Sequence, residues 1–122
     1  MSRTAATTVD DLTTFTADQG GLTKYRAGVY RKQTVTGPDT EAASLGTLVA
    51  CNVASGAVTI DLPDPDSGVG GLVMVKIMGA ATNSVTVQCA GFTIDGATTL
   101  ILNHDWEWAL LMTDGDNWIQ VG

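Results

Sequence analysis

The chain has 122 residues, of which 44% are hydrophobic and only 16% are charged, and its formal net charge is −7. This length allows one domain at most, with part of the chain outside it. The acidic balance argues against nucleic acid as the main partner. No apolar run approaches the roughly 20 residues of a membrane span, and the first residues lack the apolar stretch of a secretory signal. We therefore expect a soluble domain with neither nucleic acid nor membrane as a partner.

The charge is divided unevenly along the chain. Residues 1–32 hold five basic and three acidic residues, a net charge of +2, whereas residues 33–122 hold one lysine and ten acidic residues, a net charge of −9. A cationic segment on an anionic body is typical of an arm that docks on something acidic. The alternative is a solvated leader without a docking role. Charge alone leaves both interpretations open.

The first part of the chain is predicted to be an extended arm that gains order only on a partner. Residues 1–23 are polar and rich in threonine, with isolated apolar residues at Val9, Leu12 and Phe15. Their three-residue spacings hint at one short helix. However, threonine is a poor helix former, and Gly20-Gly21 interrupts the stretch.

Two segments link the arm to the rest of the chain. Residues 24–36 alternate between apolar and polar side chains, which fits either a strand or a hinge. We therefore place the arm and hinge at residues 1–36. Residues 37–46 are expected to form a loop with one helical turn, with Asp39 or Thr40 as its N-cap.

From residue 47 onward, short segments rich in β-branched residues are separated by turns of small and polar residues. Along one such segment, Val58, Ile60 and Leu62 share a face, and Pro63 closes it because proline cannot donate to a central ladder. About eight strands are predicted, at residues 47–53, 57–63, 72–77, 84–90, 92–94, 99–102, 106–113 and 118–122. The pattern predicts an all-β domain over residues 37–122, a small antiparallel β-sandwich or barrel of jelly-roll-like form.

The sequence offers little that could carry catalysis. His104 is the one histidine, and the nucleophile-elbow pattern G-x-S-x-G is absent. Cys89 with His104 is an imaginable nucleophile–base pair, but a strand cysteine beside Val87 is expected to be buried and unreactive. We predict a surface loop for His104, buried free thiols for Cys51 and Cys89, and no enzymatic activity.

Two acidic loops raise the question of a metal site. Asp61, Asp64 and Asp66 lie close together, and Asp114 and Asp116 precede Asn117. Neither loop continues to the bidentate glutamate of an EF-hand, and no Cys/His cluster suits zinc. An Asp-Gly pair between apolar strands is a strong hairpin signal. We predict no metal and no cofactor, with cation binding at these two loops left open.

The tryptophans gather near the C-terminal end of the sequence. Trp106 and Trp108 are two residues apart, so they are expected to share one face of a strand, and Trp118 begins the strand after the next turn. Cross-strand aromatic packing, or an interface between subunits, is the favoured interpretation. A platform on which a glycan stacks is the alternative.

One part of the sequence is similar to a known group of proteins. The segments Ile94-Asp95-Gly96 and Asp114-Gly115-Asp116-Asn117-Trp118, with the strand-like stretches before them, resemble the small β domain of tailed-bacteriophage virion proteins over about residues 57–122. Such domains occur in capsid decoration (cement) proteins and in tail fibres. The resemblance implies a non-enzymatic, homotrimeric protein that is assembled in the host cytoplasm and lies on the virion.

The small size and the polar arm favour a decoration protein on the outer capsid surface. Its partners would be the major capsid protein and further copies of itself. A tail-fibre or baseplate protein that contacts host glycan through Trp106, Trp108 and Trp118 is the alternative, and a head–tail connector is a third reading. The residues predicted to contact the capsid are Val9, Leu12 and Phe15 as apolar anchors and Lys24, Arg26, Arg31 and Lys32 as cations.

Overall fold

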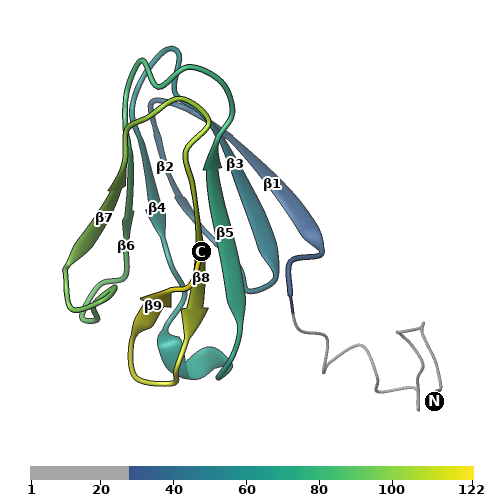
Figure 1. The fold of residues 1–122 in the computed structure, drawn as a ribbon, viewed down its shortest axis with the longest axis vertical. Coiled ribbons are helices and arrows are strands. Elements are labelled where there is room, and N and C mark those ends of the chain that lie inside the picture. The colour runs from purple at the N-terminus through teal and green to yellow at the C-terminus, as the bar shows by residue number, and fades with distance from the viewer. Residues whose placement is uncertain (1–27) are drawn as a thin grey trace, which may run out of the picture.

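Two β-sheets packed face to face make up the part of the chain that the computed structural model describes, residues 28–122 (Figure 1). The five-stranded sheet has the order β1-β3-β5-β8-β9 and consists of β1 (Arg31–Thr36), β3 (Thr47–Asn52), β5 (Leu72–Ile77), β8 (Trp108–Thr113) and β9 (Trp118–Gln120). The four-stranded sheet has the order β2-β4-β6-β7 and consists of β2 (Asp39–Ala42), β4 (Val58–Asp61), β6 (Val85–Gln88) and β7 (Thr99–Leu102). One 3₁₀ turn, η2 (Pro65–Ser67), lies between β4 and β5. The all-β prediction is confirmed.

The strands pair differently from the predicted antiparallel arrangement. From β1 to β6 the chain alternates between the two sheets, so β1, β3 and β5 pair in parallel, as do β2, β4 and β6. Only the pairs β5–β8, β6–β7 and β8–β9 are antiparallel. The turns between consecutive strands from β1 to β6 carry the chain across to the opposite sheet and not back along the same one. Strand periodicity is the same for both kinds of pairing, so it could not reveal this.

The core lies between the sheets and is built from alternate residues of each strand. Val49 and Val75 are paired in register on the five-stranded sheet, and Ile60 and Val87 on the four-stranded sheet, and all four are 0% exposed. Burial of each such side chain stabilises the fold by about 1.5–3 kcal/mol. Within residues 28–122, Cys51 and Cys89 are both buried and free, as predicted.

Residues 31–46 depart from the expected hinge and loop. β1 occupies residues 31–36, so the strand alternative holds there and the sheet begins before residue 37. The helical turn predicted after it is wrong, because Asp39–Ala42 form β2 and pair with Val58–Asp61. The Asp39 carboxylate accepts a hydrogen bond from the Thr40 backbone N–H at 2.8 Å, whereas a helix cap would accept from an N–H two or three residues further on.

The strand predicted at residues 92–94 is also wrong. Residues 92–94 form no strand: Ile94 makes only isolated bridges to Ala97 and Trp118. β7 pairs with β6 instead, in the register Val85 to Leu102. A tight turn does follow Ile94, which bridges Ala97. The chain then continues into β7, which lies beside β6.

Candidate interaction surface

The outward side of the five-stranded sheet carries apolar side chains on four of its five strands, β3, β5, β8 and β9. Successive residues of a strand point to opposite faces, so the neighbours of buried Val49, Val73, Val75 and Leu111 point outward. Leu48, Met74 and Leu110 follow one another in register across β3, β5 and β8. We define the apolar sheet face as this row together with the outward residues on either side of it, namely Leu48, Leu72, Met74, Trp108, Leu110, Met112 and Ile119.

Much of this face is accessible. Trp108 is 46% exposed and Ile119 38% exposed, and Val121, which follows β9, is 47% exposed. The residues in the middle of the sheet are half-buried by their neighbours. Scattered exposed apolar residues are common on proteins. A contiguous set on one flat face is typical of a protein interface.

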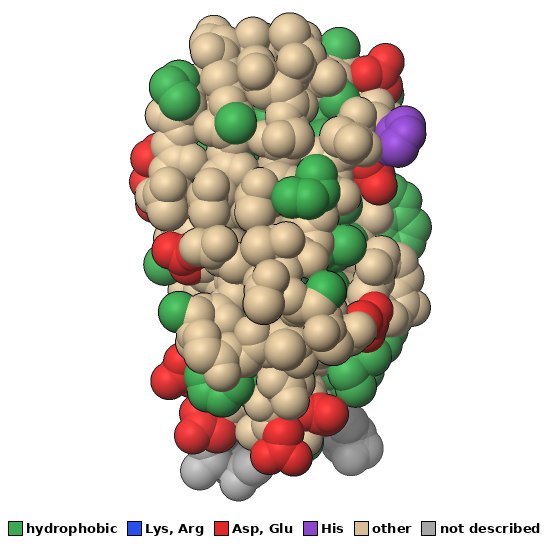
Figure 2. All heavy atoms as spheres, turned by 90° about the vertical axis from the view of Figure 1, so that its left-hand side faces the viewer, with side chains coloured by type: hydrophobic (Ala, Val, Ile, Leu, Met, Phe, Trp, Pro, Cys, Tyr) green, Lys and Arg blue, Asp and Glu red, His purple; other side chains and the backbone are tan. Residues whose placement is uncertain are grey.

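The apolar sheet face is also free of carboxylates. In residues 28–122, none of the ten acidic residues occupies an outward position of β1, β3, β5, β8 or β9, whereas Lys32 and Lys76 both do. Asp39 and Glu41 lie on β2, and Asp61 lies on β4. On the side where β6 and β7 lie, Figure 2 shows acidic side chains at the lower end and margins and no Lys or Arg.

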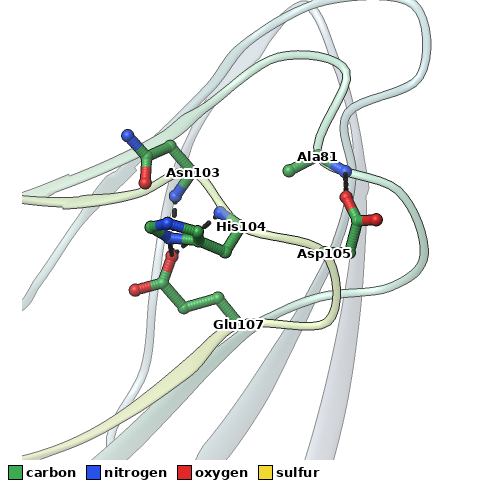
Figure 3. A network of polar contacts seen from close by, with 5 residues as sticks. All are labelled: Ala81, Asn103, His104, Asp105 and Glu107. Carbon is green, nitrogen blue, oxygen red and sulfur yellow. Dashed lines mark hydrogen bonds and ion pairs between the residues drawn. The ribbon is translucent and has the colours of Figure 1, made fainter.

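A firmly held loop, residues 103–107, borders the apolar sheet face (Figure 3). One carboxylate oxygen of Glu107 accepts hydrogen bonds from the backbone N–H groups of Asn103, at 2.8 Å, and His104, at 3.0 Å. The same oxygen lies 3.1 Å from His104 Nδ1. Burial disfavours the charged carboxylate, but these hydrogen bonds outweigh it and lower the pKa of Glu107. His104 is exposed, as predicted for a loop histidine.

The loop presents Trp106 in a constrained orientation. Its φ is +60°, a conformation that costs most residues energy. Its backbone N–H donates to the Gly79 carbonyl at 3.0 Å, and its carbonyl accepts from Lys76 Nζ at 2.9 Å. The neighbouring Asp105 carboxylate accepts from the Ala81 N–H at 2.7 Å. The indole is nevertheless 56% exposed, so the loop fixes an aromatic side chain at the surface.

Trp106 and Trp108 are both exposed, whereas Trp118 is buried. Lys76 is paired in register with Trp108 and lies over the Trp106 ring, which makes the three residues neighbours. Trp118 is 1% exposed and donates from its indole N–H to the Pro63 carbonyl at 3.1 Å. Residues directly opposite each other in a pair point to the same face, and Trp118 is opposite inward-facing Thr113. Trp118 therefore belongs to the core, which agrees with the packing interpretation and leaves only Trp106 and Trp108 for a surface contact.

The Asp114 carboxylate holds the backbone of the last hairpin by hydrogen bonds. Asp114 accepts from the N–H groups of Asp116, at 2.9 Å, and Asn117, at 2.8 Å, and these bonds lower its pKa. Gly115 has a φ of +97°, which favours glycine. The predicted hairpin between β8 and β9 is thus confirmed. Within residues 28–122 no three His, Cys, Asp or Glu side chains come together in an arrangement that could hold a metal ion.

The imagined nucleophile–base pair is separated in space. Cys89 follows β6 at the end where Gln88 pairs with Thr99, whereas His104 follows Leu102 at the other end of the same strand pair. Burial raises the pKa of the Cys89 thiol, and it raises that of Cys51 to about 11. Both thiols are therefore held in the unreactive protonated form at neutral pH.

The residues predicted to contact a capsid fall into two groups. Val9, Leu12, Phe15, Lys24 and Arg26 lie outside the described residues. Arg31 and Lys32 are exposed on β1, at the edge of the five-stranded sheet. The Arg31 guanidinium donates to the Leu45 carbonyl at 2.8 Å and lies 5.2 Å from the Tyr30 ring centroid.

Sequence reasoning missed the apolar sheet face itself. The segments 47–51, 72–77 and 108–112 are apolar at most positions of both parities, as in "LVMVKI". Such runs are typical of strands covered on both faces. In the described part of the chain only one face is covered, by the other sheet. The continuous runs were therefore the signal that could have pointed to a second contact surface.

Comparison with known proteins adds no family. The sequence matches no known protein family model, and no curated protein matches it. Among residues 28–122 there is no helix whose length and apolar character would let it cross a membrane.

Proposed function

We propose that this chain is a structural, non-enzymatic protein of a tailed-bacteriophage virion, a capsid decoration (cement) protein that binds the outer capsid surface and stabilises the shell. The observation that carries the proposal is the exposed cation pair Arg31 and Lys32, at the edge of the apolar sheet face, a carboxylate-free surface on an otherwise acidic body. Ligand and catalytic sites are mostly concave, whereas this face is one side of an open sheet and fits another protein. The sequence resemblance supplies the virion context.

In this proposal the major capsid protein is contacted through the N-terminal arm and the start of β1. The exposed cations Arg31 and Lys32 lie where the described chain begins, on the sheet edge. Their charge suits an acidic capsid surface. Binding to the assembled shell alone would raise the apparent stability of the shell by mass action. The protein would act as a homotrimer on the capsid surface after assembly in the host cytoplasm.

Shell binding by charge variants tests the proposal. Purified shells lacking the protein would be mixed with wild-type chain and with Lys32→Glu, and occupancy and shell melting temperature would be measured. We expect wild-type chain to bind and raise the shell melting temperature, and Lys32→Glu to bind more weakly. The double variant Thr40→Glu/Thr99→Glu introduces the same change of charge at exposed positions of the four-stranded sheet and should bind normally. Absence of wild-type binding would reject the decoration role.

The second candidate function is host recognition by a tail-fibre or baseplate protein, favoured by the exposed pair Trp106 and Trp108. A fixed indole beside a cation is a suitable surface for a sugar ring. Saturable binding of the isolated protein to host cells, lost in Trp106→Ala, would support this role. The copy number per virion separates the candidates, because a decoration protein is present in far more copies than a fibre or a connector.

A further inference from the structure

We infer that the apolar sheet face is the surface through which copies of this chain associate, packed around a common symmetry axis. This assignment extends the homotrimer of the proposed function to a named contact face, and it rests on that function for the existence of an oligomer. The occupant of the face is thus a second copy of this chain. Three features of the described residues favour that occupant.

The first feature is the distribution of charge. Residues 28–122 carry ten acidic and three basic residues, so two copies repel each other in most orientations. Carboxylates occupy β2 and β4, both ends of the sandwich and the turn at residue 95. The apolar sheet face is the exception, because the charged residues beside it on the sheet are Lys32 and Lys76 and no carboxylate points outward there. Two copies that meet there bring no carboxylates together.

The second feature is the chemistry at the middle of the face. Near a symmetry axis each side chain meets its own copy, so a charged side chain there would face a like charge. Met74 and Leu110 are paired in register at this place and are neutral. Lys76, the nearest cation, directs its ammonium to the Trp106 carbonyl at 2.9 Å. Its charge is thereby turned toward the loop and away from the central row.

The third feature is the presence of aromatic anchors at the rim. Trp106 and Trp108 border one end of the face, and Leu72, Met112 and Ile119 form a row at the other end. Tryptophan is enriched among the residues that dominate interfaces, and methionine makes favourable contacts with aromatic rings. Because hydrogen bonds fix the backbone of the Trp106 loop before association, little backbone freedom is lost on binding.

The area of the apolar sheet face indicates how strongly two copies should associate. Five strands about 4.8 Å apart and about six residues long give a footprint of roughly 400 Å². Stable interfaces bury roughly 800 Å² on each partner. The apolar sheet face reaches only about half of that area, so association should be weak and depend visibly on protein concentration.

Sedimentation velocity on the full chain over a range of concentrations is the direct test. We expect wild-type protein to form an oligomer that dissociates on dilution. Met74→Glu places a carboxylate in the centre of the face and should leave a monomer at every concentration. Thr86→Glu introduces the same side chain in the middle of the outward side of the four-stranded sheet and should associate like wild type. A monomeric wild type, or an unchanged oligomer in Met74→Glu, would overturn the inference.

Disulfide cross-linking tests the inference even if Met74→Glu fails to fold. In Met74→Cys, mild oxidation should join two copies by a disulfide, because position 74 lies near the symmetry axis, while Cys51 and Cys89 are buried. Thr86→Cys should remain unlinked. Linkage in both variants alike, or in neither, would contradict the assigned face. Shell binding measured in parallel keeps the two proposals apart, since an oligomer that binds no shell rejects only the decoration role.

Discussion

Lys76 Nζ donates a 2.9 Å hydrogen bond to the Trp106 carbonyl and lies 5.8 Å from the centroid of the Trp106 ring. The lysine comes from the middle strand of the five-stranded sheet, and the tryptophan from the loop between β7 and β8. One cation therefore ties the loop to the sheet and lies against the indole that the loop presents. This contact and the bond from the Trp106 N–H to the Gly79 carbonyl together hold the constrained backbone of Trp106.

Replacing Lys76 should weaken that attachment. Lys76→Met keeps the aliphatic stem but removes the donor to the Trp106 carbonyl and the cation near the ring. A hydrogen bond of this kind contributes about 1 kcal/mol, and an exposed cation–π contact about 0.5–1 kcal/mol. We expect the free energy of unfolding to fall by about 1–2 kcal/mol, measured by urea denaturation. Lys32→Met, on the same face but without such a contact, is the control, and equal losses in both variants would contradict this role.

Replacing Trp118 should lower the stability of the fold much more than replacing Trp108. Trp118 is 1% exposed and its indole N–H is bonded to Pro63, so Trp118→Ala should lower the free energy of unfolding by about 3–5 kcal/mol. Trp108 is 46% exposed, and Trp108→Ala should change it by no more than about 0.5 kcal/mol in the dissociated protein. Chemical denaturation at low protein concentration measures both. A large loss for Trp108 or a small one for Trp118 would contradict their placement.

The Glu107 carboxylate predicts a loss of stability in acid. Its pKa is lowered in the folded state, so the unfolded chain binds the proton more readily. Its stabilising contribution is present above the ordinary glutamate pKa and disappears as the pH falls through the lowered value. Asp114 acts in the same direction. Melting temperatures between about pH 5 and pH 2 should therefore fall less steeply in Glu107→Gln than in wild type.

The pKa of Glu41 is shifted in the opposite direction to that of Glu107, which provides an internal comparison. Its neighbour Asp39 raises its pKa, through a side-chain hydrogen bond and charge repulsion. Its protonated form is favoured in the folded state, and that contribution is lost as the pH rises through the raised pKa. Glu41→Gln should therefore steepen the acid-side fall in melting temperature, while Glu107→Gln flattens it. The same change of slope in both variants would contradict the assigned directions.

The buried cysteines predict complete thiol protection. Cys51 is 0% and Cys89 4% exposed, and burial raises both pKa values. At about pH 8 a thiol reagent should label neither cysteine in the native protein and both in denaturant. Met78→Cys, at a position 41% exposed, provides a reactive reference. Rapid native labelling of the wild type would show that the core opens more readily than its packing indicates.

The strands were easier to predict than their partners. Alternation in segments such as 57–62 located strands, because a half-buried strand requires it whatever lies beside it. It carries no information on which strand is adjacent, so the parallel pairs of β1 to β6 were missed. The turn at Asp114 was found because Asp-Gly favours the left-handed backbone that Gly115 adopts.

The candidate surface was predictable only in fragments. Trp106 and Trp108 were identified as possible contact residues, but their separation from Trp118 depends on the register of β8 and β9. The φ of +60° at Trp106 is set by bonds to Gly79 and Lys76, which are distant in sequence. Local propensity argues against that conformation for tryptophan. The apolar sheet face required the strand order, which brings Leu48, Met74 and Leu110 into one row.

The alternation of strands between the sheets also determines how this fold can grow. Each circuit of the chain from β1 to β6 contributes one strand to each sheet. Duplicating one circuit would therefore widen both sheets together, by about 4.8 Å each, and extend the existing rows without rotating any side chain to the other face. A hairpin inserted in the same place would widen only one layer and leave its partner sheet short. The natural unit of enlargement is the circuit, and each added circuit would broaden the contact surface while preserving its chemistry.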